Sequence, residues 1–547
     1  MAKVKKLKLN LGCGLDHKKG WINIDAVAAV APDLIHNLHQ PLPFPDAAAD
    51  ELLAQDILEH FTKEDGRTVV AELSRVLCEG GTARFRVPNI DAIISQFETD
   101  PEVRNEFLYG TTKDTGEFGA HKVGFSKASF FELCLSANLV PTSFSTVDTN
   151  MEIVCTKQQT ISKKMSLLFF IHTFGMGGAE QFMLDLCVAL KNRGHHCTIA
   201  TNHVPFLEMC KRNKVEVLPQ NISIDVIGDW KGVVKSFALA PFAAVEYFRL
   251  IQKVKPTVVI AVGFSDKFFA SFFAWVQQLP LVWIEFGPLD AVFSKFLRLP
   301  KVLYFLVKWM PHKVVVPSQN SLNKLTTGAR ISLAKLERVA CGTTIPKTTV
   351  VPNAKKVLLC VSRFAKGKGQ EVLLKAYALK KTQLAGYQLV FVGEGETLEQ
   401  CKQLAMELGI TEKTVFKGWV KDSKKEIAAA TICVFPSAWE LEGFGLVTIE
   451  AMAHAKPVIA FATGPTPEIV QQGVTGLLVT KISAQALADA LLQLSQDAEG
   501  RKKMGIAAKK RALDLFSIEN SAKEYEQVFV RGIARSLAEK SSAKMSK

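Results

Sequence analysis

Apolar, strand-like runs alternate with helical patterns along almost the whole chain of 547 residues. This alternation is typical of parallel sheets that are covered by helices on both faces. The chain is too long for a single core, and the pattern divides it into three blocks that each open with an apolar strand. We therefore predict an α/β protein with three domains. Their bounds are residues 1–156, a linker at 157–165, residues 166–352, residues 353–515, and a C-terminal helix with a basic tail at 516–547.

The cysteines and the first residues indicate a compartment. The eleven cysteines are scattered, with no Cys-x-x-Cys pair and no Cys/His cluster, so we expect reduced, buried thiols and no structural metal. The opening stretch, MAKVKKLKLN, leads into an apolar strand without a hydrophobic leader region or a cleavage site. We expect a cytoplasmic protein.

The longest uncharged run, Phe268–Ile284, approaches the length of a membrane span. It is interrupted by Gln277, Gln278 and Pro280. We interpret it as a buried helix followed by a buried strand.

Basic residues concentrate in the C-terminal two thirds of the chain. Residues 1–156 contain 15 lysines and arginines against 22 aspartates and glutamates, whereas residues 157–547 contain 52 against 31. Such an excess fits phosphates, anionic lipid or nucleic acid. No helix-turn-helix, zinc-finger or aromatic RNA-binding motif accompanies it, so we expect no nucleic-acid partner.

In the first block, LKLNLGCG at residues 7–14 predicts a strand that ends in a glycine turn, and Asp25 ends the next strand, WINID. Gly12 and Gly14 would let a ligand approach the backbone at the carboxyl edge of the sheet. An acidic side chain at the end of the second strand can accept hydrogen bonds from both hydroxyls of a ribose. These residues predict an adenosine-type ligand.

Further motifs of the first block follow in order, namely LPFPD at 42–46, a helix at Leu58-Glu59-His60 and a turn at Gly80-Gly81. With the glycine turn they resemble the small class I S-adenosylmethionine-dependent methyltransferases. The resemblance implies that Gly12 and Gly14 face S-adenosylmethionine and that Asp25 holds its ribose. Asn37 stands where such proteins often have an acidic residue near the adenine.

His60 and His121 have two interpretations. Each is either a structural histidine or a neighbour of the methyl acceptor, where an imidazole acts as a base toward a sugar hydroxyl. The residues alone leave both open.

The second and third blocks contain two anion-binding patterns. FFIHTFGMGGAE at 169–180 predicts a strand, a loop with Gly177 and Gly178, and a helix whose first backbone N–H groups face a phosphate or a sugar. VSRFAKGKG places Arg363 just past a strand and Lys368 five residues later. Two fixed cations at the edge of a sheet fit a diphosphate.

The stretch PSAWELEGFGLVTIEAMAHAKPVIAF contains two carboxylates, Glu442 and Glu450, on either side of a Gly-Phe-Gly turn and a helix start. Capping explains one acidic residue but not the second. Gly443, Phe444 and Gly445 are expected to turn their backbone N–H groups toward sugar and phosphates, with the positive end of the following helix directed at the same ligand.

These patterns, together with YQLVFVGEGE, VFKGWV and TGPTPEIVQQGVTGLLV, come in the order found in GT-B glycosyltransferases of the large retaining family four, which the chain resembles from residue 166 to about 535. The resemblance implies a nucleotide-sugar donor bound between two Rossmann-like domains. It implies that Arg363 and Lys368 neutralise the leaving diphosphate, that Glu450 binds the nucleotide ribose, and that Glu442 binds hydroxyls of the transferred sugar. No metal ligand set accompanies these residues, so we expect no metal there.

One position departs from the family pattern. Many relatives have His-Gly after the strand that corresponds to PLVWIEFG, whereas this chain has Glu285-Phe286-Gly287. If that histidine positions the donor or the acceptor, Glu285 must replace it or the role is lost.

The sequence therefore predicts a bifunctional enzyme that transfers a sugar from a nucleotide-sugar donor and a methyl group from S-adenosylmethionine, in the synthesis of a surface polysaccharide or glycolipid. Two alternatives remain: a glycosyltransferase with a non-catalytic N-terminal domain that binds a nucleoside or a partner, and a membrane-associated scaffold without chemistry.

The stretch FSKFLRLPKVLYFLVKWMPHK at 293–313 alternates aromatic and basic residues. Such a segment lies in the interface of an anionic bilayer, at the inner face of the membrane, or packs half-buried with a solvated basic face. Pro300 limits any regular amphipathic helix to the part that follows it. The residues concerned are Lys295, Arg298, Lys301, Lys308 and Lys313, with Phe293, Phe296, Leu297, Tyr304, Phe305 and Trp309.

Overall fold

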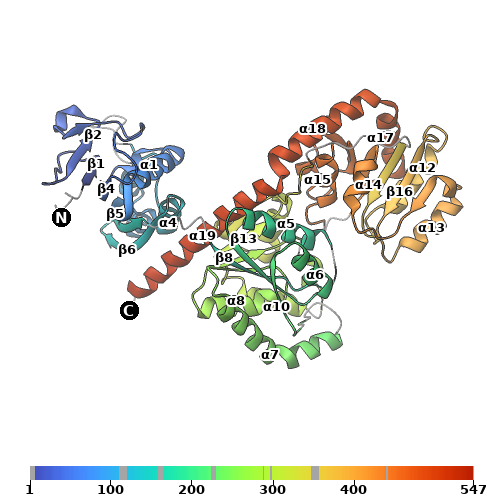
Figure 1. Cartoon of the computed structure of the whole chain (residues 1–547), viewed down its shortest axis with the longest axis horizontal. Coiled ribbons are helices and arrows are strands. Elements are labelled where there is room, and N and C mark those ends of the chain that lie inside the picture. Colours follow the sequence, from blue (N-terminus) through green and yellow to red (C-terminus); the bar gives the residue numbers. More distant parts are fainter. Residues whose placement is uncertain are drawn as a thin grey trace. The chain divides into compact units, whose positions relative to one another are not determined.

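The computed structural model describes residues 7–109, 120–157, 164–173, 175, 177–222, 224, 230–287, 289–295, 298–346, 356–438 and 442–545. The chain divides into two compact units (Figure 1). The first unit is Met1–Met165 with Gln277–Pro280 and Phe529–Lys547, and the second is Ser166–Val276 with Leu281–Val528. Most of the predicted linker, and the predicted boundary at 352–353, lie outside the described residues.

The first unit is built on one mixed sheet whose strand order is β3-β2-β1-β4-β5-β7-β6. The first five strands are parallel, and β7 pairs antiparallel with both β5 and β6. The strands are β1 (Lys8–Leu11), β2 (Ile22–Asp25), β3 (Leu34–Ile35), β4 (Ala49–Gln55), β5 (Leu77–Pro88), β6 (Leu139–Val147) and β7 (Asn150–Lys157).

The helices of the first unit are short. Leu58–His60 forms a single 3-10 turn, as does Ala28–Val30. The predicted Gly80-Gly81 turn is instead part of β5, where the pairing with β4 shifts register between Ala49 and Glu51. The α-helices are α1 (Lys63–Val76), α2 (Ile90–Gln96), α3 (Pro101–Tyr109) and α4 (Lys127–Ser136).

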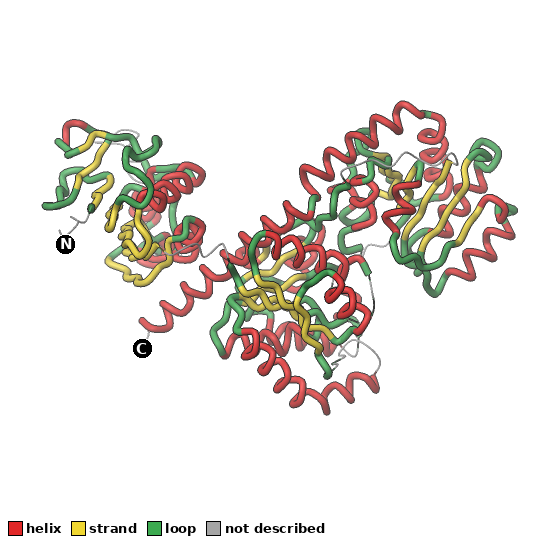
Figure 2. The backbone as a smooth tube through the Cα atoms, viewed as in Figure 1, coloured by secondary structure: helices red, strands yellow, loops and turns green. Residues whose placement is uncertain are grey.

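The second unit contains two sheets in which all strands are parallel, as the alternating pattern predicts (Figure 2). The first has the order β10-β9-β8-β11-β12-β13-β14. Its strands are β8 (Ser166–Phe170), β9 (His196–Thr201), β10 (Glu216–Pro219), β11 (Val258–Ala261), β12 (Leu281–Ile284), β13 (Lys313–Val316) and β14 (Leu336–Arg338). Its helices are α5 (Gly178–Asn192), α6 (Val204–Arg212), α7 (Trp230–Val254), α8 (Asp266–Val276), α9 (Asp290–Phe293), α10 (Leu299–Val307) and α11 (Gln319–Lys324), followed by a π-helical turn at Leu325–Ala329 and a 3-10 turn at Leu333–Lys335.

The second sheet of this unit has the order β17-β16-β15-β18-β19-β20. Its strands are β15 (Lys356–Val361), β16 (Tyr387–Val392), β17 (Thr414–Phe416), β18 (Ile432–Phe435), β19 (Val458–Phe461) and β20 (Gly476–Val479). Its helices are α12 (Gln370–Leu379), α13 (Leu398–Glu407), α14 (Ser423–Ala429), α15 (Leu446–Ala453), α16 (Thr466–Ile469), α17 (Ala484–Gln496) and α18 (Ala498–Phe516), with a 3-10 turn at Thr411–Lys413.

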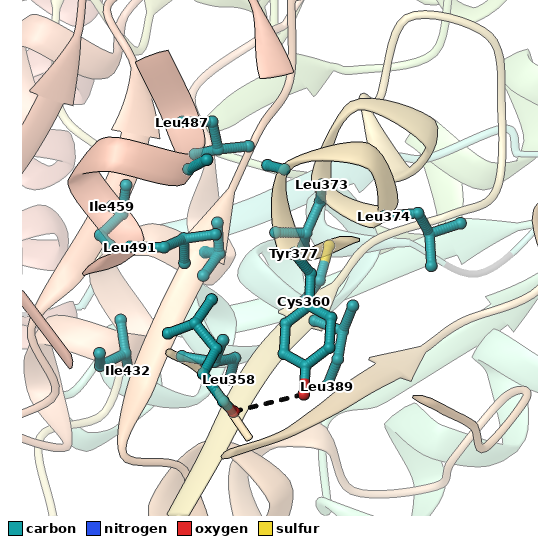
Figure 3. Close-up of a cluster of buried hydrophobic side chains, with 14 of the residues drawn as sticks. Leu358, Cys360, Leu373, Leu374, Tyr377, Leu389, Ile432, Ile459, Leu487 and Leu491 are labelled. Carbon is teal, nitrogen blue, oxygen red and sulfur yellow. Dashed lines mark hydrogen bonds between the residues drawn. The ribbon is translucent and has the colours of Figure 1, made fainter. Parts of the chain in front are cut away.

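Aliphatic side chains of β15, β16 and β18 and the inner faces of α12 and α17 form the core beside this sheet (Figure 3). Leu358, Leu373 and Leu491 are fully buried there. The Tyr377 hydroxyl donates to the Tyr387 carbonyl at 2.8 Å, so its polar group is satisfied inside the core. This packing fixes the carboxyl ends of the strands, from which the functional loops begin.

The C-terminal segment is more regular than the sequence predicts. It forms one helix, α19 (Ile518–Met545), that includes most of the expected basic tail. The uncharged run is a helix followed by a strand, α8 and β12, as predicted. However, the helix is only partly buried, because Phe272, Trp275 and Val276 are about half exposed. In the described part of the chain, no helix is both long and apolar enough to cross a bilayer. The eleven cysteines are free, and ten of them are buried.

Candidate functional site

The second unit contains a cleft of about 680 Å³ at the carboxyl ends of the parallel strands. In open parallel sheets, loops that follow the strands form the ligand site. Loops after β8, β12, β15, β16 and β18 line this cleft, and its volume lies in the range of small-molecule sites. Of the predicted donor-site residues, Gly177, Gly178, Arg363, Lys368, Glu442, Gly443, Phe444 and Gly445 line it, whereas Glu450 is not among the lining residues.

Two of the predicted catalytic residues contact each other. The Nζ of Lys368 donates to Oε2 of Glu442 at 2.5 Å, and the Ser437 hydroxyl donates to the same oxygen at 3.2 Å. Both charged side chains are mostly shielded, with 13% of Lys368 and 24% of Glu442 exposed. The pair therefore brings one cation and one carboxylate to the same wall of the cleft, although they are 74 residues apart in the sequence.

Arg363 lies on the loop after β15 with an exposed side chain. Gln370, which is fully buried, fixes this loop because its amide donates to the Arg363 carbonyl at 2.9 Å and to the Ser362 hydroxyl at 2.8 Å. The loop is thus held by its backbone while the guanidinium extends into the cleft lining. Sequence reasoning missed Gln370 and Ser437, since a lone glutamine or serine gives no signal without the tertiary contacts.

The Gly-Phe-Gly turn needs each of its glycines for a different reason. Gly445 has φ +90°, in the left-handed region that favours glycine. A Cβ at Gly443 would lie 2.0 Å from the Phe286 carbonyl oxygen, so the close approach of another loop excludes a side chain. Phe444 is buried against Phe516, with ring centroids 6.0 Å apart, which anchors the turn. Helix α15 then begins at Leu446, where the sequence predicts it.

Glu450 is half-buried on α15, near Lys424 and Asp185. Burial raises its pKa to about 7, and the nearby Lys424 ammonium opposes that shift only in part. Thr448, two residues closer to the start of the helix, lines the cleft. A carboxylate this poorly solvated gains from any hydroxyl that donates a hydrogen bond to it.

The glycine loop before α5 differs in part from the expectation. The Gly177 N–H donates to Oε2 of Glu180 at 2.9 Å, and the other oxygen of that carboxylate accepts from the Thr173 hydroxyl at 2.7 Å. The Gly177 amide therefore caps its own helix instead of facing a ligand, because Glu180 occupies the third helical position and reaches back to it. Gly178 lies close to Leu446 at the start of α15, where a Cβ would come within 2.9 Å of a Leu446 methyl.

Glu285 does not take the place of the family histidine in the cleft. It is 4% exposed and lies with its Oε1 3.4 Å from Lys267 Nζ, while the Tyr304 hydroxyl donates to the same oxygen at 2.9 Å. Phe286 and Gly287, which follow it, line the cleft instead. Burial raises the pKa of Glu285, and the Lys267 ammonium opposes this.

In the first unit, the predicted cofactor residues are brought together. The Gly14 N–H donates to Oδ2 of Asp25 at 2.9 Å, and the Val27 N–H donates to Oδ1 at 2.9 Å. Gly12 has φ +60°, and a Cβ there would lie 2.1 Å from the Ile57 side chain. Each Asp25 oxygen keeps a second lone pair for a ribose hydroxyl. Asn37 accepts from the His39 N–H at 3.0 Å and so closes a turn of its own.

His60 and His121 are neighbours, with ring centroids 5.3 Å apart. Glu59, which precedes His60 in the chain, is 1% exposed, and burial raises its pKa to about 8. Sequence reasoning missed Glu59 as a candidate. A single glutamate beside His60 gives no signal until the fold brings His121, 61 residues further along the chain, next to both.

Family models match three parts of the chain. Residues 10–85 match a methyltransferase domain, residues 176–345 match glycosyltransferase family 4, and residues 343–511 match glycosyl transferases group 1.

Curated relatives match the glycosyltransferase part. N-acetyl-alpha-D-glucosaminyl L-malate synthase of Bacillus anthracis is 30% identical over 187 residues, which are 34% of this chain and 48% of that protein. A GDP-mannose-dependent alpha-(1-6)-phosphatidylinositol monomannoside mannosyltransferase of Mycobacterium tuberculosis is 34% identical over 159 residues, which are 28% of this chain and 41% of that protein. The chain thus spans less than half the length of these relatives. An alpha-1,3/1,6-mannosyltransferase of Dictyostelium discoideum is 23% identical over 435 residues, covering 67% of this chain and 98% of that protein.

Solved structures share the fold of the second unit. The Anabaena protein HepE, in complex with UDP and glucose, superposes with a TM-score of 0.57 at 21% identity, covering 66% of this chain and 98% of that one. A glycosyltransferase of Rickettsia africae has a TM-score of 0.56 at 19% identity, covering 67% and 98%. The matched family models and the shared fold show that the chain contains a methyltransferase-type domain followed by a GT-B module, whose first part matches glycosyltransferase family 4 and whose second part matches glycosyl transferases group 1.

Proposed function

We propose that the chain transfers a sugar, with retention, from a nucleotide-sugar donor to a glycan or glycolipid acceptor, and that its N-terminal domain transfers a methyl group from S-adenosylmethionine. The product would belong to a surface polysaccharide or glycolipid made at the cytoplasmic face of a membrane. The observation that carries the proposal is the convergence of Lys368, Glu442 and the Gly-Phe-Gly turn on one cleft of about 680 Å³.

The residues of the cleft have distinct proposed roles in glycosyl transfer. As the bond between the anomeric carbon and the diphosphate breaks, negative charge develops on the phosphate oxygens. Lys368, Arg363 and the positive end of α15 stabilise that charge without a metal ion. Glu442 accepts hydrogen bonds from the donor sugar, and Glu450 from the nucleotide ribose. The oxygen of an acceptor hydroxyl bonds to the anomeric carbon on the face that the diphosphate leaves, and the proton of that hydroxyl passes to the departing phosphate oxygen.

Lys368 donates to Glu442, and donor binding does not require this contact to break. Lys368 has three donor hydrogens, so it can keep the carboxylate while it gains a phosphate oxygen. The pair then connects recognition of the sugar to recognition of the diphosphate. This connection supports a donor that carries both groups over a free nucleotide or a free sugar.

The methyl-transfer half rests on the contact between Gly14 and Asp25. This contact joins the glycine turn to the carboxylate that would hold the ribose, and S-adenosylmethionine would supply the methyl group. Two active sites on one chain raise the local concentration of one product at the other site. The remaining alternative is a GT-B enzyme whose N-terminal domain binds a nucleoside without turnover.

We also propose that the protein contacts a membrane through an apolar surface on α7, α8 and α10. These helices pack against one another beside the β8–β14 sheet (Figure 1). Trp275 and Trp309, from α8 and the end of α10, lie with ring centroids 5.7 Å apart, and each is more than half exposed. The exposed apolar residues of this surface are Val234, Phe237, Phe242, Val245, Phe248, Phe272, Trp275, Val276, Val302, Leu306 and Trp309.

The cations of the segment at 293–313 contribute less to this contact than the sequence suggests. Lys313 pairs with Glu337 at 2.7 Å, and Lys308 donates to the carbonyls of Ala329 and Arg330. Lys301 lies 5.8 Å from the Phe305 ring centroid. Phe296 and Leu297 lie outside the described residues. Aromatic insertion therefore supports the membrane contact more than charge does.

A donor panel tests the proposal. The full chain is heated with UDP-, GDP- or ADP-sugars and, separately, with S-adenosylmethionine, since a true ligand raises the unfolding midpoint by mass action. We expect one nucleotide class and S-adenosylmethionine each to raise the midpoint, and the Glu442→Ala variant to lose sugar transfer. A shift with the nucleotide sugar alone supports the alternative with an inactive N-terminal domain. Full turnover by Glu442→Ala refutes the assigned site.

A further inference from the structure

We propose that Glu59, His60 and His121 of the methyltransferase-type domain bind one divalent transition-metal ion. One carboxylate oxygen of Glu59 and one ring nitrogen of each histidine lie within 4.8 Å of one another. Ligand atoms around a bound ion lie closer together than this limit, so an ion would draw the three side chains toward a common centre. Two imidazoles and a carboxylate are the ligand set of many catalytic zinc sites and of other divalent transition metals.

The strongest support is the environment of Glu59. Its side chain is buried, and its Oε2 has no hydrogen-bond partner among the described residues. A buried carboxyl group without a partner keeps its proton, and an ion that binds it takes the place of that proton. The nearby cation, Arg86, already donates to both oxygens of Asp56 and so is paired elsewhere. A metal ion would supply the missing partner.

The backbone holds the three ligands in place. The N–H groups of Lys122 and Val123 both donate to the Glu59 carbonyl, at 2.7 and 3.1 Å, which joins the segment of His121 to that of Glu59 and His60. These two hydrogen bonds hold the segment that follows His121 against Glu59.

The orientation of His60 fits metal binding. Its Nδ1 lies 3.1 Å from the Ala120 carbonyl, to which only a protonated nitrogen can donate. This hydrogen bond fixes the tautomer and leaves the lone pair on Nε2. Such contacts to the second nitrogen are usual for metal-bound histidines.

The position of the cluster suggests what the ion would do. Ile57, two residues before Glu59, packs on the Gly12 turn that is proposed to face S-adenosylmethionine. The cluster thus follows β4 at the same edge of the sheet as Gly12 and Asp25. The role of the ion rests on the proposed methyl transfer. We infer that the coordination positions not filled by Glu59, His60 and His121 hold an oxygen of the acceptor, from a hydroxyl or carboxylate of the kind that sugars carry.

Metal binding is tested without turnover. The tag-free full chain is stripped with a chelator and titrated with Co²⁺, and the visible absorption of the ion is recorded together with the heat of Zn²⁺ binding. We expect one equivalent with the spectrum of nitrogen and oxygen ligands, and Glu59→Gln and His121→Ala to bind at least about tenfold more weakly. His17→Ala, an exposed histidine of the same unit, serves as the matched control and should bind as the wild type does.

The unfolding midpoint of each variant without metal shows whether it is folded. If Glu59→Gln does not fold, the half-buried His121 provides the second variant. A wild-type chain that binds no Co²⁺ would overturn the proposal, as would folded Glu59→Gln and His121→Ala variants with unchanged affinity. Neither result bears on S-adenosylmethionine binding, which is measured separately by calorimetry, so failure of the metal site is distinct from failure of the proposed methyl transfer.

Discussion

Lys368 Nζ lies 2.5 Å from Glu442 Oε2 in the cleft of the GT-B module, and this pair connects the loop after β15 to the turn before α15. Each residue neutralises the other in the absence of a donor. Replacing either one alone leaves a shielded charge without its partner, so single substitutions include a penalty beyond the lost ligand contact. The double variant Lys368→Ala/Glu442→Ala is needed to separate the penalty for the unpaired charge from the loss of the ligand contact.

For the diphosphate, Arg363→Ala and Lys368→Ala should each lower kcat by about 100-fold, or about 3 kcal/mol, because each removes a cation from a site of developing charge. Steady-state kinetics with the donor found in the panel measure the effect. Lys366→Ala, an exposed lysine of the same loop, is the control and should retain wild-type kinetics. Unchanged rates in both cation variants would exclude this position for the diphosphate.

For Glu450, donor affinity should increase as the pH rises from 6 to 8. Its pKa in the ligand-free fold is about 7, so below that pH the carboxyl is mainly protonated and accepts ribose hydroxyls poorly. Binding titrations across this range should show up to about tenfold change per pH unit below 7. Glu450→Gln should be weaker and flat with pH, and a variant that keeps the wild-type slope would contradict the assignment.

The same group affects stability with the opposite sign. Because the folded pKa of Glu450 lies above its ordinary value of 4.5, the folded state holds this proton more tightly than the unfolded state. The free energy of unfolding therefore falls as the pH rises from 4.5 through 7. In chemical denaturation, the free energy of unfolding of Glu450→Gln should fall less than that of the wild type as the pH rises from 4.5 to 7.

For the cofactor of the first unit, Asp25→Ala should weaken S-adenosylmethionine binding by roughly 1–3 kcal/mol, because hydrogen bonds to the ribose hydroxyls are lost. Calorimetry with S-adenosylmethionine and S-adenosylhomocysteine measures this. Asp16→Ala, an exposed acidic residue near the glycine turn, is the control. No heat with either ligand in the wild type would favour a non-catalytic N-terminal domain.

For the buried pair of the first GT-B domain, Glu285→Ala should destabilise the second unit by about 3–5 kcal/mol, since it leaves the Lys267 ammonium buried without its carboxylate. Lys267→Met/Glu285→Leu should recover most of that loss. Denaturant unfolding followed by fluorescence compares the variants. Equal stability of Glu285→Ala and wild type would show that Glu285 is not paired in solution.

For the membrane, the wild type should float with liposomes that contain anionic lipid, and Trp275→Glu/Trp309→Glu should stay in the soluble fraction because charges replace the inserted rings. Lys301→Glu/Lys308→Glu should reduce flotation less, and about 0.5 M salt should release only part of the protein. Ile506→Glu, an exposed apolar residue of α18, is the control. Flotation of the tryptophan variant at the wild-type level would refute the apolar surface.

The sequence alone determined the α/β class and the parallel sheets of the GT-B module, because runs such as KKVLLCV and YQLVFV are apolar on both faces and only a covered parallel strand buries both. It also determined the start of α15, since a glycine turn acts over a short distance. These features depend on local backbone preference, which neighbouring residues specify.

The tertiary structure decided which side chains meet. Only the fold brings Lys368 to Glu442, turns Glu285 toward Lys267 and places His121 beside Glu59 and His60. In each case the partners come from loops that follow different strands or from separate elements of the chain. The physical reason is that a charge in a partly buried site takes whichever partner the packing brings within a few ångströms, and residue spacing along the chain does not encode that distance.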